Sequence, residues 1–158
     1  MDNRETVELI VKKAIKSKTK LSFAESCTGG LVSALFTEIP GVSEILMGSA
    51  VTYSNEAKHN LLGVSEETLS TYGAVSSQCA EEMAAGSRRI YNSDVAMSIT
   101  GIAGPDGGTP EKPVGTVWFG YADKNRVISF KKEFKGSREQ VRAASVKQIL
   151  FTLSQELA

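Results

Sequence analysis

One serine lies where enzymes often hold a nucleophile. Ser26 belongs to the segment AESCTGG at 24–30, which separates a short strand-like segment, 20–25, from an apolar segment, 31–39, that stops at Pro40. At a strand-to-helix turn, the backbone amides of the helix end can bind a developing oxyanion, and their field favours negative charge. The same pattern fits a plainer interpretation, in which Ser26 or Thr28 only caps the helix.

A serine hydroxyl needs a base, and His59 is the only histidine. The other candidates are a lysine kept neutral by burial, a tyrosinate or a carboxylate. Tyr53 and Lys58 lie in TYSNEAK at 52–58, where Tyr53 ends a strand and Lys58 points from the first turns of a helix. The two could converge on one crevice. The plainer interpretation is a solvated Lys58 and a Tyr53 packed in the core.

Cys27 is a rival nucleophile beside Ser26. Together with Glu25 and Lys58 it supplies the parts of a nitrilase-like amidase. A small buried thiol is the alternative interpretation. Because a chain with a sizeable apolar core needs no covalent staple, we expect Cys27 and Cys79 to be free thiols.

Two further features suit a bound anion. The loop GIAGPDGG at 101–108 has four glycines, which can bring bare amides close to a ligand, although it lacks the lysine ending of a P-loop and the Gly-x-Gly-x-x-Gly fingerprint. Arg138 opens the last helix, where a cation gains little from the helix dipole. It could therefore serve a ligand anion or be an ordinary solvated arginine.

The elements that must position these residues alternate between strand and helix. Strands end directly before Ser26, near Tyr53 and before the glycine loop, and such ends meet at one edge of an open α/β sheet. A hairpin near the end of the chain makes the sheet mixed. By these signals we expect helices at 4–18, 31–39, 55–62, 66–73, 77–91 and 138–153, and strands at 20–25, 44–53, 94–100, 116–122 and 127–134.

Composition restricts the class of protein. The chain has 158 residues, 41% of them hydrophobic, and we expect one domain over 1–158. Lys plus Arg and Asp plus Glu are both 18, so the net charge is zero and contact with nucleic acid or a membrane surface is not expected. A single histidine excludes zinc sites built on several histidines, and no metal is expected. The absence of a signal-like or spanning apolar run predicts a cytoplasmic protein.

Three stretches together resemble the CinA C-terminal domain family. They are AESCTGG at 24–30, VTYSNEAK at 51–58, and SITGIAGPDGG at 98–108 continuing to KPVGTV at 112–117. The resemblance covers nearly the whole chain. It implies a three-layer α/β/α sandwich with a mixed sheet, without metal or organic cofactor. It also implies an amidase that converts nicotinamide mononucleotide into nicotinate mononucleotide and ammonia. Some members carry a further N-terminal domain, so this chain resembles a stand-alone amidase that forms a homodimer or higher homo-oligomer.

The resemblance also assigns roles to residues. Ser26, Tyr53 and Lys58 match the family's catalytic residues, Thr100 precedes the glycine loop, and Arg138 matches a family arginine, with Arg142 as a possible substitute. We expect Lys58, kept neutral by burial and Tyr53, to take the Ser26 proton directly or through the phenol. The expected oxyanion donors are the amides of Ser26 and Cys27. The predicted substrate-binding residues are Cys27, Thr28, Thr100, Gly101, Gly104 and Arg138.

Two other functions remain open from the sequence. The first is an amidase with Cys27 as nucleophile. The second is a nucleotide-binding module that uses the glycine loop and Arg138 to hold a ligand without turning it over.

Overall fold

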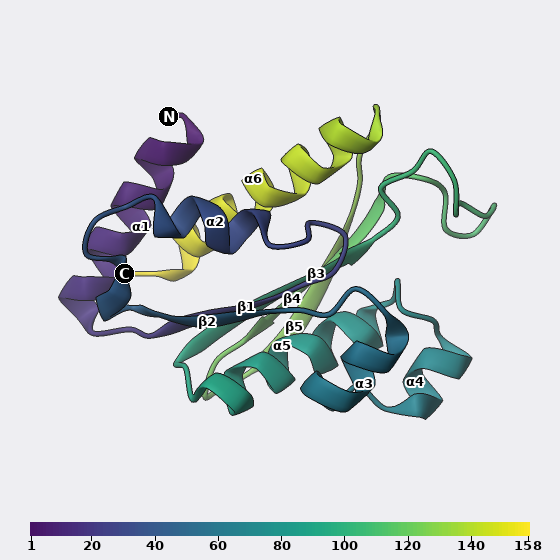
Figure 1. The fold of residues 1–158 in the computed structure, drawn as a ribbon, viewed down its shortest axis with the longest axis horizontal. Helices are drawn as coiled ribbons and strands as arrows, with labels where there is room; N and C mark the ends of the chain where they lie inside the picture. Colours follow the sequence, from purple (N-terminus) through teal and green to yellow (C-terminus); the bar gives the residue numbers. More distant parts are fainter.

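In the computed structural model, which describes residues 1–158, five strands form one mixed sheet in the order β2-β1-β3-β4-β5 (Figure 1). β1 pairs in parallel with β2 and β3, whereas β4 runs antiparallel to β3 and β5. The predicted mixed sheet with a C-terminal hairpin is therefore confirmed. The strands are β1 Leu21–Glu25, β2 Leu46–Val51, β3 Val95–Gly101, β4 Thr116–Ala122 and β5 Val127–Glu133.

Helices cover both faces of the sheet and produce the three layers that were expected. In Figure 1, α1, α2 and α6 lie on one face, and α3, α4 and α5 lie on the other. None of these helices is long and apolar enough to cross a membrane. The helices are α1 Asn3–Ser17, α2 Leu31–Thr37, α3 Asn55–Leu62, α4 Glu66–Thr71, α5 Ser77–Tyr91 and α6 Arg138–Glu156, with a 3₁₀ turn at Val42–Glu44.

Local signals in the sequence explain where most helices begin. The hydroxyls of Ser54, Ser65 and Ser76 accept hydrogen bonds from the third residue of α3, α4 and α5, respectively. Ser137 and Gln140 form the expected capping box at the start of α6. These side chains satisfy amides that a helix leaves unpaired at its first turn. α2 is different, because its first turn has no cap from a neighbouring serine or threonine.

The side chains of β1 alternate between two hydrophobic clusters. Phe23 belongs to a cluster of 24 buried residues that includes Ile10 of α1 and Ile149 of α6. Ala24 faces the other way, into a cluster of six that includes Leu62 of α3 and Met83 of α5. This alternation follows from the two-residue period of a strand. The strand that carries Ser26 at its end is thus fixed from both faces.

A glycine allows α3 to approach α5 closely. A Cβ atom at Gly86 would lie 2.1 Å from the carbonyl oxygen of Leu62. Any other residue at this position of α5 would push the end of α3 outwards. The contact matters because α3 carries Lys58.

Candidate active site

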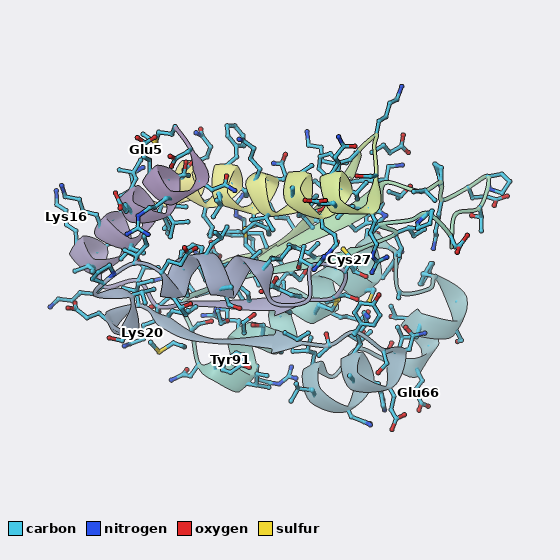
Figure 2. The ribbon with its side chains drawn as sticks, turned by 45° about the horizontal axis from the view of Figure 1, so that its top comes forward. Glu5, Lys16, Lys20, Cys27, Glu66 and Tyr91 are labelled. Carbon is cyan, nitrogen blue, oxygen red and sulfur yellow. The ribbon has the colours of Figure 1, made fainter.

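The candidate residues gather at the carboxyl ends of β1, β2 and β3. In Figure 2, Lys20 labels the chain just before β1 and Cys27 labels the turn just after it. These ends enclose a cleft of about 190 Å³. Such an edge is the usual ligand position in open α/β sheets. The residues that line the cleft are Ser26, Cys27, Tyr53, Asn55, Lys58, Ala74, Val75, Thr100, Gly101, Ala103 and Arg138.

Ser26 and Lys58 are in direct contact at the bottom of the cleft. Lys58 Nζ lies 2.9 Å from Ser26 Oγ, a hydrogen-bonding distance. Lys58 is only 1% exposed, so the interpretation of a solvated lysine is wrong. Its Nζ also donates to the carbonyl oxygens of Thr52 at 2.9 Å and Tyr53 at 3.0 Å. Two of its hydrogens are thus held by carbonyls, and the third position of the nitrogen faces the serine.

The surroundings of Lys58 favour the neutral amine. Burial lowers the pKa of Lys58 from its ordinary value of 10.5. The thiols of Cys79 and Cys27 act in the opposite direction only when ionised, and burial raises the pKa of each to about 11. At neutral pH they are protonated, so burial dominates. Lys58 takes part in none of the four salt bridges of the molecule, and no carboxylate stabilises its charge.

Tyr53 contacts Lys58 through its backbone carbonyl and Arg138 through its side-chain hydroxyl. Its carbonyl accepts from Lys58, whereas its hydroxyl accepts from Arg138 Nη2 at 3.2 Å. The side chain is 62% exposed, so the interpretation of a core aromatic is wrong. The phenol has no hydrogen bond to Ser26 or Lys58. This geometry favours direct proton transfer from Ser26 to Lys58 over a route through the phenol.

The helix after Ser26 is capped by Glu25, not by Ser26 or Thr28. Glu25 Oε1 accepts from the amides of Gly30 at 3.2 Å and Val32 at 3.0 Å. Its Oε2 accepts from the amide of Ser33 at 3.1 Å. The simple capping interpretation of Ser26 is therefore wrong. The hydroxyl of Ser26 is free to face the cleft because a neighbouring carboxylate satisfies the helix end.

The backbone amides at the turn differ from the expected oxyanion donors. The amide of Ser26 donates to the carbonyl of Ile99 at 3.0 Å, so it is not available to a ligand. The amide of Cys27 donates to no protein group. The amides at the start of α2 are also taken, because Glu25 accepts from Gly30, Val32 and Ser33 and the carbonyl of Thr28 accepts from Leu31. Of the two amides predicted from the sequence, only that of Cys27 can stabilise an oxyanion.

Cys27 is a poor candidate for the nucleophile. Its thiol is buried, and burial raises its pKa to about 11, so the reactive thiolate is scarce at neutral pH. Glu25, its proposed partner, is directed at the end of α2. Cys27 and Cys79 are both free thiols, as expected.

Two predicted substrate-binding residues do not line the cleft. Thr28 is fully buried, and its hydroxyl donates to Glu25 at 2.7 Å. Gly104 lies beside the cleft, where its carbonyl accepts from Arg138 Nη1 at 2.9 Å. The assignment of both residues to substrate binding stays a prediction.

Thr100 and Gly101 do line the cleft, at the end of β3. The hydroxyl of Thr100 donates to the carbonyl of Ala74 at 2.9 Å, which ties two walls together. A Cβ atom at Gly101 would lie 2.7 Å from the side chain of Val117. Packing against Val117 therefore explains a glycine at position 101, whether or not a ligand binds there.

Arg138 and Arg142 have separate positions. Arg138 is exposed at the rim, held by Tyr53 and Gly104. Arg142 is half-buried and donates to the carbonyls of Cys27 at 3.0 Å and Thr28 at 3.2 Å. Arg142 therefore supports the turn, and only Arg138 lines the cleft.

Sequence reasoning missed four residues that line the cleft. Asn55 lies between Tyr53 and Lys58, and its place in that motif was a usable signal. Ala74, Val75 and Ala103 are small apolar residues in loops, and no local pattern distinguishes them from other loop residues. A larger apolar hollow of about 560 Å³ between α1 and α6 contains none of the candidate residues. No group of His, Cys, Asp or Glu side chains is arranged to hold a metal ion.

Comparisons with known proteins show the family to which the chain belongs. The family model described as the CinA C-terminal domain matches residues 3–157. A relative named nicotinamide-nucleotide amidohydrolase PncC, from Enterobacter agglomerans, is 53% identical over 146 residues, covering 90% of this chain and 89% of that protein. A CinA-like protein from Fervidobacterium nodosum is 46% identical over 145 residues, covering 92% of this chain.

The chain spans only 36% of the length of that CinA-like protein. Among solved structures, a CinA superfamily protein from Klebsiella pneumoniae superposes with a TM-score of 0.95 at 34% identity. The superposition covers 99% of this chain and 98% of that one. The resemblance and the fold class predicted from the sequence are both confirmed.

Proposed function

Because this chain belongs to the CinA C-terminal domain family, we propose that it is an amidohydrolase that converts nicotinamide mononucleotide into nicotinate mononucleotide and ammonia. The contact between buried Lys58 and Ser26, at 2.9 Å, carries the proposal. The 53% identity to a protein named nicotinamide-nucleotide amidohydrolase supports the substrate.

The first half of the reaction forms an acyl-enzyme. Neutral Lys58 accepts the hydroxyl proton of Ser26 while Oγ bonds to the carboxamide carbon. The carbonyls of Thr52 and Tyr53 keep the lone pair of Lys58 directed at the serine during this transfer. The amide of Cys27 donates to the oxyanion, and one such donor contributes about 3 kcal/mol in comparable sites. Lys58 then protonates the leaving nitrogen as the C–N bond breaks, and ammonia departs.

The second half uses water. Lys58, neutral again, takes a proton from a water molecule whose oxygen bonds to the acyl carbon. The ester bond to Ser26 breaks, and Lys58 returns the proton to the serine. Nicotinate mononucleotide leaves, and no group other than this chain's own residues is needed to balance protons.

The size of the cleft supports a divided binding mode. Sites for drug-sized ligands occupy roughly 300–1,000 Å³, and this cleft has about 190 Å³. It suits the pyridine carboxamide, with the ribose and phosphate outside it. Arg138 lines the cleft at its rim and suits the phosphate. Thr100 and Gly101 form the wall against the ring.

The oligomeric state and the cellular compartment of the enzyme are also proposals. We propose a homodimer or higher homo-oligomer that acts in the cytoplasm. The exposed Phe151 beside the apolar hollow between α1 and α6 supports contact with a second copy. Light scattering on the purified protein tests the oligomeric state.

The decisive experiment measures ammonia released from nicotinamide mononucleotide, in the presence of a chelator, by wild type and Ser26→Ala. We expect turnover by wild type and none by the variant, with substrate still bound in calorimetry. Full activity in Ser26→Ala would overturn the serine mechanism. Binding without turnover by wild type would support the silent nucleotide-binding module instead.

A further inference from the structure

The carboxylate of Glu25 makes more contacts than helix capping alone requires. It is fully buried and accepts six hydrogen bonds of 3.2 Å or less. A cap normally satisfies one or two amides of the first turn. The donors are the hydroxyls of Thr28, Ser33 and Ser49 and the amides of Gly30, Val32 and Ser33.

These contacts close the turn that carries the nucleophile. Glu25 directly precedes Ser26, and its side chain reaches forward to residues 28, 30, 32 and 33. Ser26 and Cys27 therefore lie inside a loop that is fixed at both ends by one carboxylate. The amide of Ser26 is also fixed, through its bond to the Ile99 carbonyl.

Arg142 fixes the same turn by binding its backbone carbonyls. Its guanidinium donates to the carbonyls of Cys27 and Thr28, while the amides beyond them face Glu25. The carbonyl of Ser26 accepts from the amide of Gly29 at 3.1 Å, which orients the peptide group that contains the free amide of Cys27. The Glu25 carboxylate thus accepts from backbone amides of the turn, and the Arg142 guanidinium donates to its backbone carbonyls. Together they hold the peptide planes around Ser26.

We propose that Glu25 and Arg142 are positioning residues, which hold Ser26 Oγ against Lys58 and the Cys27 amide against the oxyanion. The inference rests on the proposed function, because it assumes that Ser26 is the nucleophile. Neither residue lines the cleft that we assign to the pyridine carboxamide, so neither touches the reacting group. Their loss should therefore lower kcat and leave KM nearly unchanged.

The test for Glu25 is Glu25→Gln, which keeps the shape and replaces one acceptor by a donor that faces other donors. We expect a loss of about 100-fold in kcat with KM within about twofold, since small misplacements near the reacting atoms have effects of this size. Ser49→Ala is the matched control. It removes one hydrogen bond to Oε2 that does not anchor the turn, and kcat should stay within about threefold.

Labelling of Ser26 by a sulfonyl fluoride, followed by mass spectrometry, separates this proposal from the choice of substrate. We expect slower labelling in Glu25→Gln than in wild type, at equal folded fraction by circular dichroism. Slower labelling in the variant without turnover of nicotinamide mononucleotide by wild type would leave the positioning role intact and reject the substrate. Unchanged labelling and unchanged kcat in Glu25→Gln would overturn the inference.

The two arginines provide a second, independent test. Arg142→Met should lower kcat and the labelling rate of Ser26 at nearly constant KM. Arg138→Met should raise KM for the mononucleotide and leave labelling by the small sulfonyl fluoride within about twofold of wild type. A rise in KM alone for Arg142→Met would show that Arg142 binds substrate and would contradict the positioning role.

Discussion

In the proposed mechanism, burial allows Lys58 to act as a base and not as a surface cation. It is buried without a carboxylate partner, and backbone carbonyls occupy two of its hydrogens. Carbonyl dipoles satisfy the hydrogen bonds of the amine without providing the full negative charge that would keep it protonated. The remaining hydrogen-bonding position of Lys58 Nζ faces Ser26 Oγ. The proposed reaction depends on the lone pair that Lys58 has when it is unprotonated.

The pH dependence of the reaction follows from this state. Only unprotonated Lys58 can accept the serine proton, so kcat/KM should rise with pH until Lys58 is neutral. Burial lowers the pKa of Lys58 from 10.5, and the rise should therefore end below that pH. Ammonia release measured from pH 5 to pH 10 checks this. Activity that falls steadily with pH over this range would exclude a lysine base.

Stability should change with pH for the same reason. The pKa of Lys58 is lower in the folded chain than the ordinary 10.5, so between the two values the unfolded chain binds more protons. The free energy of unfolding therefore rises with pH between the pKa of the folded chain and 10.5. The stability gained in this way is lost as pH falls through the pKa of the folded chain. Lys58→Met should remove that rise, as measured by urea midpoints at several pH values. Lys124→Met, in the exposed hairpin turn, should keep it.

The thiol of Cys27, beside Ser26, should be inert. With a pKa of about 11, Cys27 is ionised at pH 7 in roughly one molecule in ten thousand. Iodoacetamide at neutral pH should leave activity nearly unchanged, and Cys27→Ala should remain active. Rapid inactivation that follows the modification of Cys27 would instead support the cysteine amidase.

At the scale of the elements, the sequence predicted the strands and most helices because their signals are local. The capping box of Ser137 with Gln140 and the hairpin turn after β4 involve residues two or three apart. The cap of α2 had no such signal, because Glu25 reaches a helix that begins six residues later across the turn. Its role depends on how the turn folds in three dimensions.

The same difference between local signals and three-dimensional packing explains which parts of the site were predicted. The three motifs placed Ser26, Tyr53 and Lys58 at one sheet edge, as the strand ends require. The direction of each side chain was not predictable, since a lysine on a short helix usually faces solvent. Arg142 could not be told from Arg138 for a similar reason. One helical turn separates them, and only packing of α6 against the turn directs one inwards and one to the rim.

The contact between α3 and α5 can be tested at Gly86. Gly86→Ala places a methyl group against the Leu62 carbonyl and should destabilise the protein by about 1–3 kcal/mol. It should also reduce kcat, because the shift moves the helix that holds Lys58. Thermal unfolding and ammonia release measure the two effects. Gly48→Ala is a useful comparison, since there the close atoms belong to the ring of Tyr91, away from the cleft, and kcat should change less.

For the whole molecule, we propose that residues 1–158 form one domain. One sheet supports both hydrophobic clusters, and Lys13 of α1 donates to the carbonyl of Ser154 in α6, which joins the two ends of the chain. We expect a single calorimetric transition with equal calorimetric and van't Hoff enthalpies. Two resolved transitions would show that the α3–α5 layer unfolds by itself.

The position of Arg142 has a consequence for the order in which the enzyme is made. The ribosome completes Ser26, Tyr53 and Lys58 long before it reaches α6, so a nascent chain holds every reactive group while its nucleophilic turn is still open on one side. Catalytic competence should therefore appear only after α6 has left the ribosome and docked against the turn. A chain stalled before Arg138 would carry the reactive groups without the arginine that fixes their turn, and we expect it to be inactive.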